Sequence, residues 1–155
     1  NKPVKYKEAL DNIRGAGIDV SSEMIIGMDE DHEDVFDNTY NFIMDHRIST
    51  PRVHILTPVP GTPLYKELLA TGRITSQDFS QFSGGTVVFK PKNISPHSLQ
   101  TKYWDLYQKL FTYRAIGHRI LGSPTFQNPM MRAFVLGVNL HYRHHIKHGI
   151  TPGIV

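Results

Sequence analysis

The stretch Thr57-Pro58-Val59-Pro60-Gly61-Thr62-Pro63-Leu64 holds three prolines and one glycine within eight residues, and it decides how the chain is read. Residues 52–56 before it alternate between two faces, one of them apolar, which is the period of a half-buried strand. Pro58 has no N–H for a sheet ladder, so the strand must end there. Thr62-Pro63 has the pattern of an N-cap followed by proline at the first helical position. The stretch therefore predicts a stiff turn from the end of a strand into a helix.

The residues before this turn repeat the same alternation. An apolar stripe at helical spacing predicts a helix from about Tyr6 to Arg14, closed by Gly15-Ala16-Gly17. A strand is predicted from Ile18 to Gly27, followed by a helix with acidic residues at its start. Helices and strands that alternate across short loops indicate a parallel sheet built from βα units, a fold of the α/β class.

Two strands cannot cover their own edges, and a closed (β/α) barrel needs about 250 residues. We therefore expect the last βα units of a partial TIM-like (β/α) barrel, followed by a C-terminal helical extension. Residues 1–90 would form the C-terminal portion of the barrel, and residues 91–155 the extension. Within the extension, Ser95-Pro96 begins a helix expected to run to about Leu121. Since the chain begins with Asn1 and not with methionine, we expect a piece of a longer protein.

Composition excludes some chemistry. The 155 residues contain no cysteine, so the chain offers no disulfide, no thiolate nucleophile and no thiolate metal ligand. A formal net charge of +3 is too small to argue for nucleic acid. Hydrophobic residues make up 39%, and no apolar run is long enough to cross a bilayer. We expect a cytoplasmic protein.

A second strand end carries candidate binding residues. Ile25 and Gly27 close the strand, and Glu30 follows three residues later. The glycine would let a flat ligand approach the backbone, whose N–H and C=O groups could read the edge of a purine while Ile25 covers its face. The acidic run from Asp29 to Asp34 could suggest a metal site, but such runs are more often solvated helix starts, and we assign no metal ligand.

Together the two strand ends resemble the later part of a radical S-adenosylmethionine (radical SAM) enzyme, most closely the subgroup with a cobalamin-binding domain upstream. The family pattern GxIxGxxE on the fifth barrel strand is matched by Ile25, Gly27 and Glu30, whereas Glu23 stands at the first glycine. A sequence pattern typical of the subgroup resembles the order Leu56-Thr57-Pro58-x-Pro60-Gly61-Thr62-Pro63-Leu64-Tyr65. The resemblance covers roughly residues 6–74, and the helical tail resembles C-terminal extensions more loosely.

The resemblance implies a function for the parent protein. S-adenosylmethionine would be cleaved reductively to a 5′-deoxyadenosyl radical, which modifies or methylates an unknown small-molecule or lipid substrate. Ile25, Gly27, Glu30, Leu56, Thr57 and Pro58 would form the adenine-side wall of that site. The family's [4Fe–4S] cluster is held by a three-cysteine loop. Because this chain has no cysteine, that loop is either upstream of Asn1, in a missing N-terminal part, or absent. Cobalamin would bind in an upstream domain. The fragment alone is therefore expected to be inactive, and no catalytic residue is assigned within it.

Two other functions stay open at this point. The chain could be the end of an unrelated βα-barrel enzyme that uses the same edge for a phosphate or a sugar. It could instead be a non-catalytic docking module for RNA, a membrane or a partner, through its basic helical tail.

Near the end of that tail the chain gathers His141, Arg143, His144, His145, Lys147 and His148. His141, His145 and His148 fall at i, i+4 and i+7, a spacing that can bind a metal. The basic residues could also hold phosphate or lie on an anionic membrane surface. The simpler interpretation, which we adopt, is a solvated helix end whose cations favour the negative pole of the helix dipole.

Overall fold

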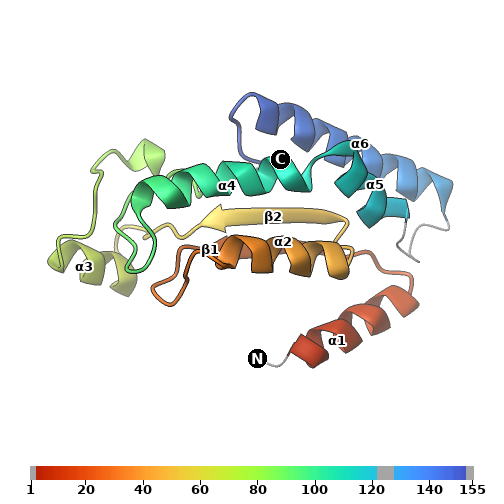
Figure 1. Ribbon diagram of the computed structural model, residues 1–155, viewed down its shortest axis with the longest axis horizontal. Coiled ribbons are helices and arrows are strands. Elements are labelled where there is room, and N and C mark those ends of the chain that lie inside the picture. Colours follow the sequence, from red (N-terminus) through yellow and green to blue (C-terminus); the bar gives the residue numbers. More distant parts are fainter. Residues whose placement is uncertain (1–2, 122–127, 153–155) are drawn as a thin grey trace. The chain divides into compact units, whose positions relative to one another are not determined.

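The structure, a computed structural model, describes residues 3–121 and 128–152. Figure 1 shows its helices and strands along the chain. In order these are α1 (Pro3–Gly15), β1 (Ser21–Ile26), α2 (Val35–Asp45), β2 (Thr50–Ile55), α3 (Pro63–Ala70), the 3₁₀ helix η1 (Phe79–Gln81), α4 (Pro96–Leu110), α5 (Tyr113–Leu121) and α6 (Pro129–Lys147).

The sheet consists of β1 and β2, which lie parallel and are joined through α2. This mixed α/β arrangement confirms the predicted α/β class and is compatible with the predicted βα units. The described residues contribute two strands to the sheet, so membership of a barrel stays a prediction. Among the described helices, none combines the length and the apolar character that a membrane span requires.

The first strand begins later than predicted, because Ile18 belongs to the cap of α1. Gly17, with φ of 78°, donates its N–H to Arg14 O at 2.9 Å, and the N–H of Ile18 bonds Ile13 O at 3.2 Å. These two bonds are the Schellman pattern, which uses up the backbone groups that a strand would need. The glycine cap is therefore confirmed, and the strand starts at Ser21.

The helix predicted to run from Ser95-Pro96 to about Leu121 is interrupted. α4 ends at Leu110, and α5 starts at Tyr113. Thr112 separates them, since its Oγ1 accepts a hydrogen bond from the N–H of Ala115 at 3.2 Å and so caps the second helix. A threonine hydroxyl that competes for backbone donors explains the break, which the apolar spacing by itself does not reveal.

The chain forms two compact units. One consists of Asn1–Ser22, Asn38–Arg52 and Tyr107–Val155, and the other of Glu23–Asp37 and Val53–Leu106. The predicted boundary at residue 90 concerns the parent protein and stays a prediction.

In the first unit, helix α5 packs against α6 (Figure 1). Its core includes Ile43, Ile48, Leu110, Phe111, Ile116 and Tyr142. In the second unit the buried residues come from both strand ends, from the segment after η1 and from α4: Ile26, Val53, Ile55, Val88, Phe89, Leu99 and Tyr103.

Some apolar residues expected inside are exposed. Tyr6 and Ile13 of the predicted stripe on α1 are each more than a third accessible. On β1, Ile26 is fully buried, whereas its neighbour Ile25 is exposed. Apolar periodicity reports which face is able to pack, and whether that face is covered depends on elements elsewhere.

Candidate functional site

The ends of β1 and β2 lie next to each other in the second unit. The N–H of Leu56 donates to Ile26 O at 2.8 Å, which extends the sheet pairing one residue beyond β2. Residues 25–30 leave the first strand and residues 56–58 leave the second, so the structure brings both predicted groups of site residues to the same edge. This follows from the parallel pairing, because parallel strands have their carboxyl ends at the same edge of the sheet.

Ile25 presents an apolar surface at this edge. Its side chain is 53% exposed, whereas Ile26 beside it is 1% exposed. Alternation along the strand explains the difference, since successive side chains point to opposite faces of a sheet. An exposed isoleucine of this kind can cover the face of a planar ring.

Gly27 is a glycine for reasons internal to the fold. Its φ is +91°, a backbone conformation that residues with a side chain rarely adopt. A Cβ at this position would also lie 2.9 Å from Leu99 Cδ2 and 3.7 Å from Phe89 Cζ. The space beside the backbone is therefore filled by α4 and by the segment before it. On this side of the backbone, Leu99 and Phe89 leave no room for a ligand, and the approach of a ligand to Gly27 from another side stays a prediction.

The acidic run after Gly27 is organised by Asp31. Its Oδ2 accepts the N–H of Gly27 at 2.8 Å and that of Met28 at 2.9 Å. The carboxylate thus closes the turn that leaves β1 and does not cap α2, which begins at Val35. Glu30 lies on the outside of this turn and is exposed.

On the second strand, the predicted residues differ in accessibility. Leu56 and Thr57 are half-buried, and Pro58 is buried. The hydroxyl of Thr57 donates to Ile55 O at 3.0 Å. The N–H of Leu56 is already bound to Ile26 O, so this donor is not available to hydrogen-bond a base. The predicted backbone contact with a base would therefore have to be made by the other peptide groups of residues 56 and 57.

The proline-rich turn has the geometry that its sequence predicts. Thr62 N donates to Val59 O at 3.1 Å, with Pro60 and Gly61 between them and φ of 90° at the glycine. Proline followed by a glycine of positive φ is the pattern of a type II turn. Thr62 then caps α3 by accepting the N–H of Tyr65, and Pro63 occupies the first turn, as predicted.

A charged cluster fixes the loop after β1, and the local sequence pattern gives no indication of it. The Asp29 carboxylate accepts two hydrogen bonds from the Arg73 guanidinium, one from Nη1 at 2.9 Å and one from Nη2. It also forms an ion pair with Lys92 Nζ at 2.8 Å. Asn93 donates to the Asp29 carbonyl at 2.7 Å, and Arg73 Nε donates to Lys90 O at 2.7 Å. The bonds from Arg73, and after them those from Lys92, hold the pKa of the Asp29 carboxyl well below its usual range.

The same loop is held to α4 by Glu33. Its carboxylate accepts a hydrogen bond from Ser98 Oγ at 2.8 Å and pairs with Lys102, whose ammonium also lies 5.7 Å from the centroid of the Phe36 ring. Both contacts lower the pKa of Glu33, that of Lys102 more strongly. Three of the acidic residues after β1, Asp29, Asp31 and Glu33, are thus used in a turn and in ion pairs. Within the described ranges, no group of three or more His, Cys, Asp or Glu is placed to hold a metal ion.

The histidines of α6 form two pairs. The rings of His141 and His145 have centroids 4.1 Å apart, and those of His144 and His148 are 4.4 Å apart. His148 therefore pairs with His144 and does not join His141 and His145 on one face. Desolvation, and then the neighbouring imidazoles, lower the pKa of His145. This arrangement gives no support to the metal alternative.

Known proteins share sequence with most of the chain. The bacteriochlorophyllide d C-12(1)-methyltransferase of Chlorobaculum tepidum is 30% identical over 138 residues, which are 86% of this chain and 30% of that protein. The bacteriochlorophyllide d C-8(2)-methyltransferase of the same organism is 27% identical over 124 residues, 80% of this chain and 28% of the relative.

A third relative is the anaerobic magnesium-protoporphyrin IX monomethyl ester cyclase of Cereibacter sphaeroides, 27% identical over 112 residues, 72% of this chain and 18% of that protein. No model of a known protein family matches the chain. The chain thus spans less than a third of the length of these curated relatives.

Proposed function

This chain is homologous to radical S-adenosylmethionine enzymes over most of its length, and on this premise we propose that it forms the adenine-side wall of an S-adenosylmethionine site. The parent enzyme would cleave S-adenosylmethionine reductively and use the resulting radical to modify or methylate a small molecule. Two relatives are named as methyltransferases and one as a cyclase, so their names support this class of chemistry without selecting one outcome.

The observation that carries the proposal is the exposed side chain of Ile25 beside the paired strand ends. Ile25 is 53% exposed, and the hydrogen bond between Leu56 and Ile26 brings residues 56 and 57 to the same edge. An adenine ring could lie with one face on Ile25 while its edge meets the remaining peptide groups of Leu56 and Thr57. Pro58 and the type II turn hold this backbone stiffly, which lowers the entropy lost on binding.

The residues present fit one of the implied cofactors better than the others. The apolar and backbone surface suits the adenosyl part of S-adenosylmethionine. A [4Fe–4S] cluster needs thiolate ligands, and the chain contains no cysteine, so these residues do not hold the cluster. No residue described here is assigned to cobalamin. In the parent protein this segment would therefore position the nucleoside and exclude water, while another part of that protein would supply the cluster.

The site is tested by Ile25→Asp in the complete protein. A carboxylate at this position would place charge against the apolar face of adenine and is expected to weaken S-adenosylmethionine binding at least tenfold, a loss of about 1.4 kcal/mol. Isothermal titration of the reconstituted protein under anaerobic conditions measures this. Ile18→Asp is the matched control, because Ile18 is similarly exposed at 59% and lies outside the predicted site. Equal affinity for the two folded variants would reject the proposed site.

A second experiment addresses the fragment. Because the chain brings no thiolate ligands, it is expected to form no 5′-deoxyadenosine when incubated with S-adenosylmethionine and a reductant, in contrast to the complete protein. Release of 5′-deoxyadenosine by the fragment alone would contradict this division of roles. Three closely spaced cysteines in the upstream reading frame would separate the proposal from an unrelated βα-barrel enzyme.

A further inference from the structure

A cavity in the first unit is lined by cations and apolar side chains. Its volume is about 550 Å³, within the range of roughly 300–1,000 Å³ that small-molecule sites occupy. It lies between residues 108–112, where α4 gives way to α5, and the last two turns of α6. None of the described residues that line it is acidic.

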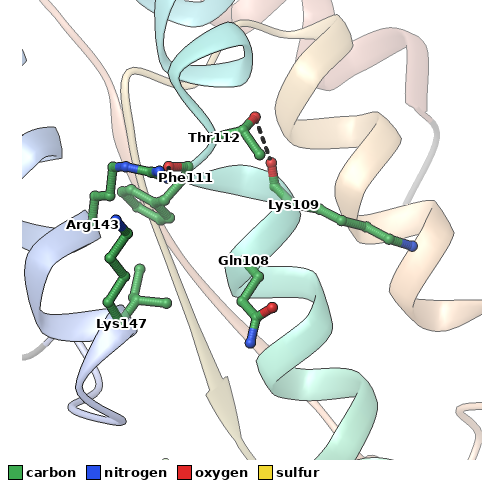
Figure 2. A pocket seen from close by; sticks show the side chains of 7 residues that line it. Gln108, Lys109, Phe111, Thr112, Arg143 and Lys147 are labelled. Carbon is green, nitrogen blue, oxygen red and sulfur yellow. Dashed lines mark hydrogen bonds between the residues drawn. The ribbon is translucent and has the colours of Figure 1, made fainter.

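Two basic side chains of α6 define the charge of this cavity. Arg143 and Lys147 are one helical turn apart, and Figure 2 shows both extending from α6 toward Phe111. Lys109 also lines the cavity, but its side chain points away from them in the same view. Two like charges on one side of a cavity repel each other, and an anion placed between them would remove this cost.

The guanidinium of Arg143 is already held in a fixed orientation. It donates from Nη1 to Phe111 O, and its Cζ lies 4.2 Å from the centroid of the Tyr113 ring. Stacking on one face and a hydrogen bond at one edge fix the plane of the fork, so little side-chain entropy is lost when an oxyanion binds. Lys147 is exposed and supplies a second positive charge.

We propose that this cavity binds a phosphate monoester group attached to an apolar body. A phosphate monoester carries about −1.5 to −2 charges at neutral pH, which balances the two cations better than a single carboxylate does. Arginine accommodates phosphate oxygens through its planar fork, and lysine acts as a point charge. A bare ion would not fill the cavity, whereas Phe111 and Ile146 offer an apolar wall to an organic body.

Titration calorimetry with three probes tests the proposal. Phenyl phosphate has both the dianion and the ring, inorganic phosphate lacks the ring, and benzoate has the ring with one charge. Phenyl phosphate is expected to bind most tightly. Lys147→Glu should weaken its binding about tenfold or more, as expected for the loss of a charge-assisted contact and the addition of a like charge. The matched control is Lys66→Glu, which makes the same charge change on α3 and should bind like the unaltered chain.

Arg143→Gln is the second variant, and its thermal unfolding is compared with that of the unaltered chain because Arg143 also packs on Tyr113. Vesicles of phosphatidylcholine with and without phosphatidic acid distinguish a lipid phosphate from a soluble one. The proposal is supported if the unaltered chain binds the soluble or the lipid phosphate and Lys147→Glu abolishes that binding. No binding by the unaltered chain, equal binding by Lys147→Glu, or benzoate binding as tightly as phenyl phosphate would overturn it.

Discussion

The guanidinium of Arg73 donates hydrogen bonds from both terminal nitrogens to the carboxylate of Asp29, 44 residues earlier in the chain. This bidentate pair joins the loop after β1 to the residues after α3. Arg73 is also fixed through the backbone, because the N–H of Lys90 donates to Arg73 O at 2.8 Å. The loop that carries Glu30 is therefore held by contacts distant in sequence.

Asp29→Asn should destabilise the second unit. The substitution removes the charge from a partly buried pair and leaves Arg73 without its counter-ion, at a cost of about 1 kcal/mol in the free energy of unfolding. Chemical denaturation at neutral pH measures this difference. Asp11→Asn, which breaks the exposed pair with Lys7 on α1, is the control and should change the unfolding free energy little. Equal effects of the two variants would contradict the structural role of Asp29.

The same aspartate predicts a dependence of stability on pH. Because the pKa of Asp29 is lower in the folded chain than the usual value of about 3.9, its contribution is fully present above that value. As the pH falls below about 3.9 toward the folded pKa, protonation removes this contribution progressively. The difference in unfolding free energy between the unaltered chain and Asp29→Asn should therefore shrink between pH 5 and pH 2.5. A constant difference over this range would contradict the assignment.

Gly27→Ala should destabilise the chain more than Gly61→Ala. Both glycines have nearly the same φ, +91° and +90°, so alanine costs about 1–2 kcal/mol of backbone strain at each. Only at Gly27 would the new Cβ meet Leu99 Cδ2 at 2.9 Å, which adds about 1–3 kcal/mol of overpacking in the buried core. Urea denaturation of both variants measures the difference, which isolates the contact. Equal losses would mean that Leu99 moves aside freely.

Asn139→Ala should be strongly destabilising in the first unit. Asn139 is fully buried, accepts a hydrogen bond from Arg119 Nη2 at 2.8 Å and donates to Ser49 O at 3.0 Å. Burial lowers the pKa of Arg119 to about 10, so this side chain remains a buried cation at neutral pH. Loss of the amide removes the acceptor of Arg119 Nη2, while Nη1 keeps Leu110 O, and it removes the Asn139 donor from the Ser49 carbonyl. Buried polar groups that lose a partner in this way cost about 2–4 kcal/mol in unfolding free energy.

The control for this prediction is Asn128→Ala on the same helix. Asn128 caps α6 at an exposed position, and its loss is expected to cost about 1 kcal/mol. Thermal unfolding of both variants under the same conditions compares them. A loss for Asn139→Ala no larger than that for Asn128→Ala would show that the buried network contributes little.

Local features were predicted well. The Thr62-Pro63 helix start, the glycine cap after α1 and the helix–strand alternation from α1 to α3 follow from backbone chemistry within a few residues, and the structure confirms them. The relationship to radical S-adenosylmethionine enzymes is likewise confirmed by the relatives. The cobalamin subgroup, the barrel and the adenine-binding role of the strand ends stay predictions.

Errors occurred where a residue's role depends on distant parts of the chain. The side of Gly27 where a Cβ would lie is filled by Leu99 and Phe89, more than 60 residues away, which the sequence around Gly27 does not indicate. The apolar stripe of α1 was expected to be buried, but Tyr6 and Ile13 are exposed. A period in the sequence identifies a face but contains no information on what lies against it.

The amino-acid sequence alone determined where strands end and helices begin, because proline, glycine and capping hydroxyls act on peptide groups only a few bonds away. It also determined that the chain holds no thiolate ligand. Only the tertiary structure decided which partners the charged residues have: Asp29 with Arg73, and Arg143 with the carbonyl of Phe111. Such pairings depend on where the folded chain brings distant segments together, and no local rule records that.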